Sequence, residues 1–385
     1  MKIAMIGQKG IPATYGGIER HVEEIATRLV DRGHQVSVYS RLYYSHHEGA
    51  YRGVDNRRLF SLHTKHLDAI SHCALATLHS LAARYDIVHF HALGPSIFSF
   101  LPRLTGARTV VTVHGLDWQR GKWGRFASSF LRFCEKTSVR FPDRTIVVSK
   151  TLARYYWEKH HARTFMIPNG TNPGTFRLPN RIKRWGLDRH PYILFVGRLV
   201  PEKGCHYLIE AFRRVKTDMH LVMAGGSSFS DEYVQSLEKL RAGDERIQMI
   251  GYVYGEVLEE LWSNAYLVAQ PSILEGLSLS LIEALSFGRC VLVSDIPENM
   301  EVVEDSAVSF RSRDEEDLRA KLQLCVDHPA MVEATAQRCR ALGEDRYSWP
   351  RLVEATERVY ESALSGEPVG AAQHAEGGEP GHLEP

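Results

Sequence analysis

Two cations lie five residues apart in the segment VGRLVPEKG, residues 196–204. Arg198 and Lys203 follow a short apolar run, so we expect both side chains at the carboxyl end of a strand. A guanidinium can bind two phosphate oxygens at once, and an ammonium adds a mobile point charge. The alternative is a solvated pair on a surface turn. Their place just after a break in the sequence pattern favours a binding site for a diphosphate.

Two glutamates, Glu275 and Glu283, lie eight residues apart in SILEGLSLSLIEALSFG, residues 272–288. Between them, Gly276, Leu277 and Ser278 fall at an expected helix start, where free backbone N–H groups can hold a phosphate. Most glutamate pairs at this spacing are simply solvated. These two flank an apolar, glycine-bearing segment, which favours contacts from both carboxylates to the hydroxyls of one extended ligand.

A glycine-rich segment, IGQKGIPATYGGIER at residues 6–20, joins an expected strand to an expected helix. Its glycines, Gly7, Gly10, Gly16 and Gly17, do not have the GxGxxG spacing. Such a turn still lets an anion approach backbone N–H groups and the positive end of a helix. The alternative is a tight connection. No acidic residue ends the next strand, which argues against a nicotinamide dinucleotide.

Secondary-structure elements must position these candidate residues. Short β-branched runs alternate with amphipathic segments along most of the chain. This pattern is typical of βα units around a mostly parallel sheet. The expected strands are 2–6, 35–39, 86–90, 109–113, 145–148, 192–196, 220–224, 247–250, 266–270, 290–294 and 307–310. The expected helices are 19–32, 67–84, 206–215, 231–242, 257–263, 279–287, 315–327 and 349–364.

The domain organisation follows from this pattern and from the length of 385 residues, which exceeds what one core usually supports. We predict an α/β protein of two Rossmann-like, doubly wound domains that face a central cleft, because ligands bind at the carboxyl ends of parallel strands. The predicted ranges are a first domain at 1–170, a linker at 171–190, a second domain at 191–346, a returning helix at 347–364 and a disordered tail at 365–385.

Composition excludes several classes of function. The net charge is +1, so nothing pulls the chain toward nucleic acid. Six scattered cysteines without a CxxC pair indicate neither a zinc site nor a disulfide framework. The first residues form an expected strand rather than a signal peptide, and no apolar segment is long enough to span a membrane. We therefore expect a cytoplasmic protein.

The three segments together resemble the retaining glycosyltransferases of family 4, whose fold is GT-B. EGLSLSLIE matches the family's E-x7-E motif, and GRLVPEKG matches its Arg/Lys diphosphate motif. IPNG at 167–170, VSK at 148–150 and the helix SWPRLVEATERVYES also match, so the resemblance covers roughly residues 1–364. The segments GQKGIPATYGGIER and HGLDWQRGKW are most similar to a bacterial subgroup that includes rhamnosyltransferases of surface-polysaccharide assembly.

The resemblance implies a role for each catalytic candidate. Arg198 and Lys203 would neutralise the departing nucleotide diphosphate, and Glu275 would hold hydroxyls of the donor sugar. His114, after the expected strand 109–113, would approach that sugar. The family's usual His-Asp pair reads HGLDW here, which leaves Asp117 three residues away as a candidate on the acceptor side.

The resemblance also implies the donor-binding residues. Glu283 would hold the ribose, while the nucleobase would lie near Gly251 and Tyr252. Gly16 and Gly17 would lie under the donor phosphates, opposite the amides of the segment 276–278. The implied reaction moves a sugar from a nucleotide-diphosphate donor to a glycan or lipid-linked acceptor without a metal, consistent with the lack of an Asp-x-Asp motif. The alternatives are a catalytically silent nucleotide-sugar-binding protein and an epimerase or hydrolase acting on the same donors.

Two weaker features remain. His89 and His91 are spaced like a metal pair, but a lone His-x-His is more often a structural feature of a strand end, and no third ligand is evident, so we expect no metal. His91 is instead a candidate residue of the acceptor side. The segment 118–140 interleaves aromatic and basic residues with a single acid, Glu135. It is either a surface that contacts anionic membrane, where lipid-linked acceptors reside, or a core-facing helix with a solvated basic face.

Overall fold

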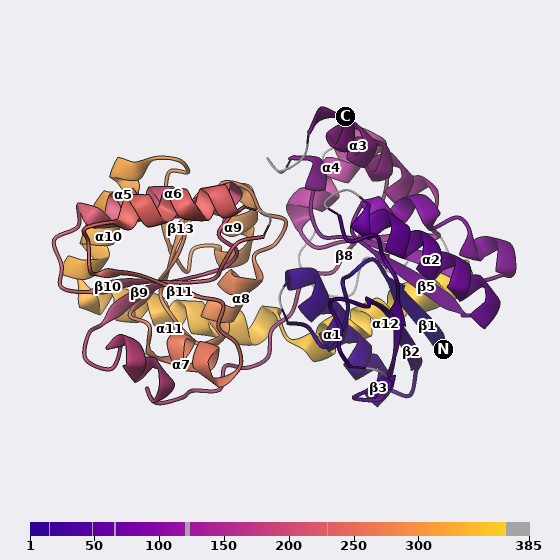
Figure 1. Ribbon diagram of the computed structural model, residues 1–385, viewed down its shortest axis with the longest axis horizontal. Helices are drawn as coiled ribbons and strands as arrows, with labels where there is room; N and C mark the ends of the chain where they lie inside the picture. Colours follow the sequence, from indigo (N-terminus) through magenta and orange to yellow (C-terminus); the bar gives the residue numbers. More distant parts are fainter. Residues whose placement is uncertain (15, 48, 65–66, 120–123, 229, 367–385) are drawn as a thin grey trace.

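The structure is a computed structural model. It describes all residues except 15, 48, 65–66, 120–123, 229 and 367–385, and it leaves out the side chains of 344 and 345. Nearly all of the tail predicted for 365–385 therefore lies outside the described residues. The described chain forms two α/β lobes, each a sheet covered by helices (Figure 1). We call them the N-terminal and the C-terminal lobe.

The N-terminal lobe contains an eight-stranded sheet of order β3-β4-β2-β1-β5-β6-β7-β8. Its neighbouring strands are parallel except for the β3–β4 pair. The strands are β1 (Lys2–Ile6), β2 (Gln35–Arg41), β3 (Gly49–Tyr51), β4 (Val54–Leu59), β5 (Ile87–His91), β6 (Arg108–Val113), β7 (Arg144–Val147) and β8 (Phe165–Met166). Its helices are α1 (Gly17–Asp31), α2 (Asp68–Ala83), α3 (Arg125–Arg140) and α4 (Lys150–His160).

The C-terminal lobe contains a six-stranded, wholly parallel sheet of order β11-β10-β9-β12-β13-β14. The strands are β9 (Tyr192–Val196), β10 (His220–Ala224), β11 (Ile247–Gly251), β12 (Leu267–Gln270), β13 (Val291–Ser294) and β14 (Val308–Phe310). The helices are α5 (Cys205–Arg213), α6 (Asp231–Arg241), α7 (Glu256–Asn264), α8 (Leu279–Ser286), α9 (Pro297–Val303), α10 (Glu315–Asp327) and α11 (Pro329–Arg346). Both sheets bury both faces, which is why their central strands read as nearly continuous apolar runs.

The last helix, α12 (Trp349–Ser365), returns to the N-terminal lobe, where Figure 1 shows it in yellow beside the purple elements. Its Trp349 and Tyr360 are buried in the core under β1 and β6. Gly170 makes room for this docking, because a Cβ there would lie 2.6 Å from the Trp349 ring. The last residue of α12, Ser365, lies inside the range predicted as tail.

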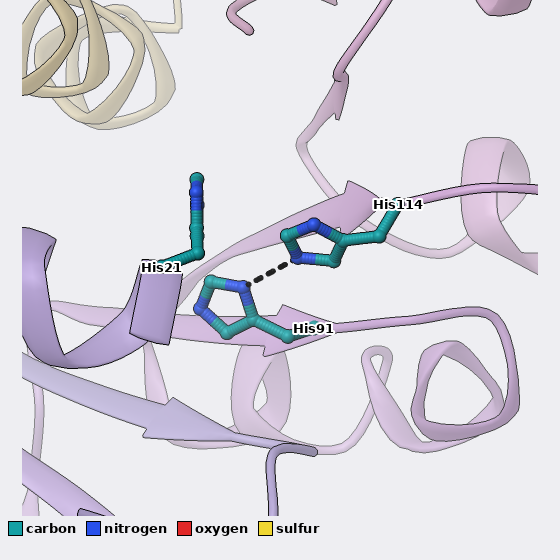
Figure 2. Close-up of side chains that lie close together, drawn as sticks. All are labelled: His21, His91 and His114. Atoms are coloured by element: carbon teal, nitrogen blue, oxygen red, sulfur yellow. Dashed lines mark hydrogen bonds between the residues drawn. The ribbon is translucent and has the colours of Figure 1, made fainter. Parts of the chain in front are cut away.

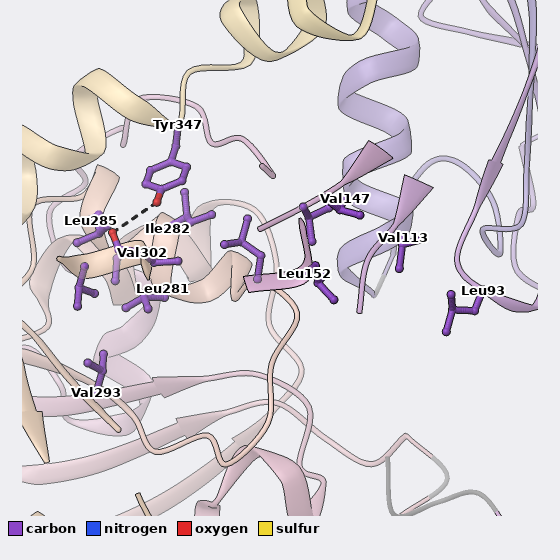
Figure 3. Packing of buried hydrophobic residues seen from close by; sticks show 14 of the residues in the cluster. Leu93, Val113, Val147, Leu152, Leu281, Ile282, Leu285, Val293, Val302 and Tyr347 are labelled. Carbon is purple, nitrogen blue, oxygen red and sulfur yellow. Dashed lines mark hydrogen bonds between the residues drawn. The ribbon is translucent and has the colours of Figure 1, made fainter. Parts of the chain in front are cut away.

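One hydrophobic cluster contains residues of both lobes (Figure 3). Val113 and Val147 belong to it from the N-terminal sheet, and Leu281 and Leu285 from α8 of the C-terminal lobe. Tyr347, just before α12, is also buried there. Burying apolar surface stabilises by roughly 25 cal/mol per Å², so this shared cluster favours the closed arrangement of the lobes.

The predicted strands and helices are all present, with ends moved by no more than two residues. The sequence patterns missed β3, β4, β8, α4, α9 and α11, and they gave α3 only as one of two alternatives for the segment 118–140. The hairpin of β3 and β4 lies at the edge of the sheet and carries polar residues, so it lacks a clear apolar alternation. The 171–190 segment is also more ordered than its sequence indicates, because the backbone N–H groups of Asn180 and Ile182 donate to the Glu260 carboxylate at 2.8 and 3.2 Å.

Within the described parts of the chain, no helix is both long and apolar enough to cross a membrane. All six cysteines are buried and free, as expected of cysteines that serve as packing residues.

Candidate active site

The candidate site lies where the two lobes meet at the carboxyl ends of their strands. A pocket there is lined by Gly115 and Leu116 of the N-terminal lobe and by Arg198, Glu202, Lys203, Leu274, Glu275 and Gly276 of the C-terminal lobe. Three of the predicted catalytic residues, Arg198, Lys203 and Glu275, therefore share one pocket. They come from the loops after β9 and β12, which are neighbours in the sheet.

Lys203 and Glu275 form an ion pair with 2.5 Å between Nζ and Oε1, and their side chains are only 12% and 9% exposed. Two further groups donate to the same carboxylate: the Ser272 hydroxyl at 2.6 Å and the Gln270 amide at 3.1 Å. Burial alone raises the pKa of Glu275, but the Lys203 charge and these hydrogen bonds outweigh it and lower the pKa. Glu275 is thus held as a carboxylate inside the pocket.

The backbones of the two lobes touch beside this pocket. A Cβ at Gly276 would collide with the carbonyl oxygen of His114, and a Cβ at Gly115 would lie 3.5 Å from Gly276 Cα. Nearby, a Cβ at Gly17, the first residue of α1, would lie 2.9 Å from Leu279 Cδ1 in α8. Glycine at these positions allows the lobes to close fully. Gly17 therefore lies against Leu279, just after the 276–278 segment.

Glu283, in the second turn of α8, faces the N-terminal lobe. Its Oε1 lies 3.2 Å from Nη1 of Arg20 in α1, and its side chain is 14% exposed. Burial raises the pKa of Glu283 against the opposing effect of the Arg20 charge, and Glu24 raises it further. The two motif glutamates thus have opposite pKa shifts, because Glu275 contacts a buried cation and two further donors, whereas Glu283 has one charged partner, Arg20, which is half exposed.

The residues between the two motif glutamates are buried. Leu277 is 8% exposed and Ser278 is 2% exposed. The Ser278 hydroxyl accepts a hydrogen bond from the Gln270 amide at 3.0 Å, so its side chain is not the cap of α8. The N-terminal turn of α8 therefore presents backbone amides rather than a side-chain acceptor next to the junction of the lobes.

The glycine-rich N-terminal loop lies on the opposite side of the junction. Burial lowers the pKa of Lys9 and outweighs the charge of Glu19, while the charges of Arg41 and of Arg198 from the other lobe lower it further. Lys9 therefore lies within electrostatic reach of the Arg198 site. Gly16 adopts a φ of 105°, which favours glycine, and the space its Cβ would need is occupied by the Glu19 carboxylate.

Gly251 and Tyr252 lie apart from this junction, at the end of β11. The Tyr252 hydroxyl donates to the carbonyl oxygens of Gly226 and Ser227, both at 3.0 Å. A Cβ at Gly226 would lie 2.7 Å from the Tyr252 ring, and the ring of Tyr254 is parallel to it at 6.1 Å. The end of β11 thus offers an aromatic surface beside the glycines that follow β10.

Three histidines of the N-terminal lobe meet behind the junction (Figure 2). His91 ends β5, His114 follows β6, and His21 lies in the second turn of α1. Nδ1 of His91 is 3.2 Å from Nε2 of His114, and the rings of His21 and His114 are 4.8 Å apart edge to face. Burial lowers the pKa of His21 to about 4 and that of His91 well below its ordinary value. His91 and His114 are thus neighbours, as two adjacent strand ends require.

His89 bonds other side chains than those of the histidine group, although it is only two residues from His91 in the sequence. Its two ring nitrogens bond the Tyr360 hydroxyl at 2.8 Å and the Thr112 hydroxyl at 2.7 Å. The side-chain contacts of His89 are therefore structural.

Asp117 lies half-buried in a short 3-10 turn, Asp117–Gln119, and does not line the pocket.

The basic segment 118–140 is only partly described, because Arg120 and Lys122 lie outside the described residues. Its single acid, Glu135, is fully buried and contacts Lys159 at 2.9 Å, His160 at 2.5 Å and the Trp118 indole at 2.6 Å. The outward face of α3 consists of Arg125, Phe126, Ser129, Arg132, Phe133, Lys136 and Arg140. The charges exposed along this helix are therefore all positive.

The residues at the site that sequence reasoning did not identify include Lys9, Arg20, His21 and Gly115. Lys9 stands between two glycines of the N-terminal loop and Arg20 ends the GGIER segment, so both had a local signal. His21 and Gly115 had none, because their importance depends on contacts between segments far apart in the chain.

Comparison with known proteins agrees with this geometry. Residues 15–175 match the family model described as Glycosyltransferase Family 4, and residues 180–344 match the one described as Glycosyl transferases group 1. Alpha-maltose-1-phosphate synthase of Mycobacterium tuberculosis is 27% identical over 94% of this chain and 99% of its own length. Among solved structures, sucrose-phosphate synthase from Thermosynechococcus elongatus superposes with a TM-score of 0.81 at 20% identity, covering 95% of this chain and 100% of that one.

A second solved structure, HepE of Anabaena in complex with UDP and glucose, has a TM-score of 0.78 at 18% identity over 94% of this chain and 100% of that one. The two matched families leave only residues 1–14, 176–179 and 345–385 uncovered. The chain therefore belongs to the glycosyltransferases of family 4, retaining enzymes with the GT-B fold that use nucleotide-sugar donors.

Proposed function

We propose that this enzyme transfers a sugar from a nucleotide-diphosphate donor to a glycan or lipid-linked acceptor in bacterial cell-surface polysaccharide synthesis, and that it belongs among the rhamnosyltransferase-like members of its family. The observation that carries the proposal is the pocket between the lobes, where Arg198 and Lys203 stand beside Glu275 and face the backbone of Gly115. This is a donor site for a diphosphate with a sugar attached.

The transfer step builds negative charge on the diphosphate and positive charge on the sugar as the anomeric C–O bond breaks. Arg198 and Lys203 stabilise the departing diphosphate, and Lys203 is fixed in place by Glu275 before the donor arrives. Fixed charges need no reorganisation during the reaction, which makes them effective in a water-poor pocket. The amides of 276–278 add donors at the start of α8.

The family resemblance supports the remaining donor contacts in this proposal. Glu275 and Glu283 accept hydrogen bonds from hydroxyls of the sugar and of the ribose, while the nucleobase lies against Gly251 and Tyr252 at the end of β11. Ribose binding at Glu283 replaces its contact with Arg20. His114 approaches the sugar from the N-terminal lobe, and Asp117 and His91 belong to the acceptor side.

No side chain is assigned as the base. The acceptor hydroxyl attacks the anomeric carbon on the face from which the diphosphate leaves, and its proton passes to a phosphate oxygen of that leaving group. The bond from the anomeric carbon to the phosphate oxygen breaks, and the new glycosidic bond forms with retained configuration. The residues of the pocket then serve to stabilise charge rather than to exchange protons.

The outward face of α3 supports a lipid-linked acceptor. Phe126 is 89% exposed and Phe133 is 52% exposed, between the positive charges of Arg125, Arg132 and Lys136. Aromatic rings enter the interface of a bilayer, and each nearby cation adds about 1 kcal/mol of attraction to an anionic surface. We therefore place the enzyme in the cytoplasm, at the inner face of the cell membrane.

A panel of UDP-, GDP- and dTDP-sugars tests the function. The correct donor should raise the unfolding temperature by mass action, since it binds only the folded state. The same donor, incubated with lipid extracts, should yield a new glycolipid or glycan. Stabilisation without any turnover would identify a silent binding protein, and free sugar in place of a glycoside would identify a hydrolase; either result would reject the proposal.

A further inference from the structure

We propose that His21, His91 and His114 form a binding site for a divalent transition-metal ion such as Zn²⁺. The site is separate from the diphosphate cations, and the transfer step proposed above does not use a metal.

The distances among the three rings fit one small ion. Each histidine offers a ring nitrogen, and these three nitrogens lie within 4.8 Å of one another. Two nitrogens bound to a tetrahedral zinc at about 2.0–2.1 Å lie about 3.4 Å apart. Nδ1 of His91 and Nε2 of His114 are already 3.2 Å apart, so only the His21 ring has to move inward.

The ring arrangement fits as well. The ring centroids are 5.8 Å apart for His21 and His91, 4.8 Å for His21 and His114, and 5.5 Å for His91 and His114. Three imidazoles around one tetrahedral zinc have centroids about 5 Å apart, by the same bond length. Figure 2 shows the His21 ring edge-on beside the other two, so the three rings surround a common point.

The scaffold that holds these rings is rigid. His91 ends β5, and His114 follows the neighbouring strand β6, in which Thr112 is in register with His91. His21 projects from α1 and is 2% exposed, whereas His91 is fully buried. Sites built on strands and helices are held more closely than sites on loops.

Two buried ring nitrogens lack partners, and an ion bound at Nδ1 of His21 would satisfy one of them, whereas His91 faces His114 with its other nitrogen, Nδ1. Nδ1 of His21 and Nε2 of His91 have no hydrogen-bond partner within the described structure. A buried polar atom without a partner costs roughly 1–3 kcal/mol.

The donor set indicates the class of ion. Three imidazoles without a carboxylate suit zinc, cobalt, nickel or copper, whereas magnesium and calcium require oxygen ligands. Three ligands leave a fourth position open, as at catalytic or inhibitory zinc sites rather than closed structural ones. His89 is not a ligand, since both of its nitrogens are occupied.

A consequence that rests on the proposed function is inhibition. An ion held by His114 would keep that ring from the donor sugar, so micromolar zinc should slow transfer in the wild type. Metal binding itself does not depend on this consequence, because it can be measured without a donor.

The direct test titrates chelator-treated, full-length enzyme with metal. Visible absorption monitors the binding of Co²⁺, and calorimetry measures the binding of Zn²⁺. We expect one ion per chain, and at least tenfold weaker binding in His21→Gln and in His91→Gln. His89→Gln and the exposed His46→Gln should bind like the wild type. Unfolding temperatures without metal identify any variant that fails to fold, and the two ligand variants provide independent tests.

The absence of stoichiometric binding in the wild type, or unchanged binding in both ligand variants, would overturn the metal site whether or not the enzyme transfers sugar. Binding without inhibition would leave the site intact and would instead contradict the role of His114 in the proposed function.

Discussion

The ammonium of Lys203 lies 2.5 Å from the Glu275 carboxylate, and both side chains are about nine-tenths buried. The pair joins the loop after β9 to the loop after β12 across neighbouring strands. Under the proposed function, this one contact fixes a cation for the diphosphate and a carboxylate for the sugar. Loss of either partner should therefore affect stability as well as catalysis.

Replacing Lys203 with methionine removes the cation and leaves the Glu275 carboxylate buried without its partner. Breaking a buried pair in this way costs about 3–5 kcal/mol. We expect unfolding in urea at a clearly lower midpoint and a turnover reduced by about 100-fold or more. The double variant Lys203→Met/Glu275→Gln should recover much of the stability but none of the activity. The exposed Lys239→Met is the matched control; a single variant as stable as this control would show that the pair is not buried as described.

The two motif glutamates should contribute oppositely to the pH dependence of stability. The folded-state pKa of Glu275 is lowered, so its contribution is present above the ordinary glutamate pKa and is lost as the pH falls through the folded value. The folded-state pKa of Glu283 is raised, so stability is lost as the pH rises through that value.

Urea unfolding between about pH 2.5 and 7 measures this difference, because the Glu275 contribution is lost below the ordinary glutamate pKa and the Glu283 contribution above it. The stability cost of Glu275→Gln should be largest at pH 7 and should shrink on acidification. For Glu283→Gln the cost should be smallest at pH 7 and should grow on acidification. Parallel curves for the two variants would contradict the assigned environments.

Replacing Gly276 with alanine tests the closed junction of the lobes. The new Cβ would collide with the His114 carbonyl, which belongs to the other lobe and cannot rotate away. We expect the lobes to separate, with kcat/KM at least tenfold lower and an unfolding free energy within about 1–3 kcal/mol of the wild type. Small-angle scattering should detect the opening. Gly94→Ala, where a Cβ meets open space, should change neither quantity.

Features that depend on a local sequence pattern could be predicted, whereas contacts between distant segments could not. Most of the strands and the cluster of Arg198, Lys203 and Glu275 were predictable, because each depends on a local pattern followed by a short loop. The contacts of Gly276 with His114 and of Glu283 with Arg20 were not, because they exist only once two separate lobes close.

The histidines show the same limit. From the His-x-His spacing of His89 and His91 we expected a structural strand end without a metal. The structure turns His89 toward Tyr360 and Thr112 and places His21 and His114 beside His91. Sequence spacing predicts which side chains share a face of a strand. It does not predict which helix packs over that face.

The face of α3 makes a prediction about membrane binding. The double variant Phe126→Ser/Phe133→Ser should sediment with anionic vesicles at least tenfold more weakly than the wild type, because its rings no longer enter the interface. Phe176→Ser, a matched change at a ring that is 62% exposed elsewhere, should bind normally. Equal binding of the wild type to neutral and to anionic vesicles would contradict the role of the cations.

The central claim is that Arg198 and its neighbours hold a nucleotide diphosphate. Calorimetry of the stabilising nucleoside diphosphate against the wild type, Arg198→Met and the exposed Arg189→Met tests it most directly. Because hydrogen bonds to a charged group contribute about 1.5–3 kcal/mol, Arg198→Met should bind at least tenfold more weakly, while Arg189→Met binds as the wild type does. Equal affinity in all three proteins would contradict the account.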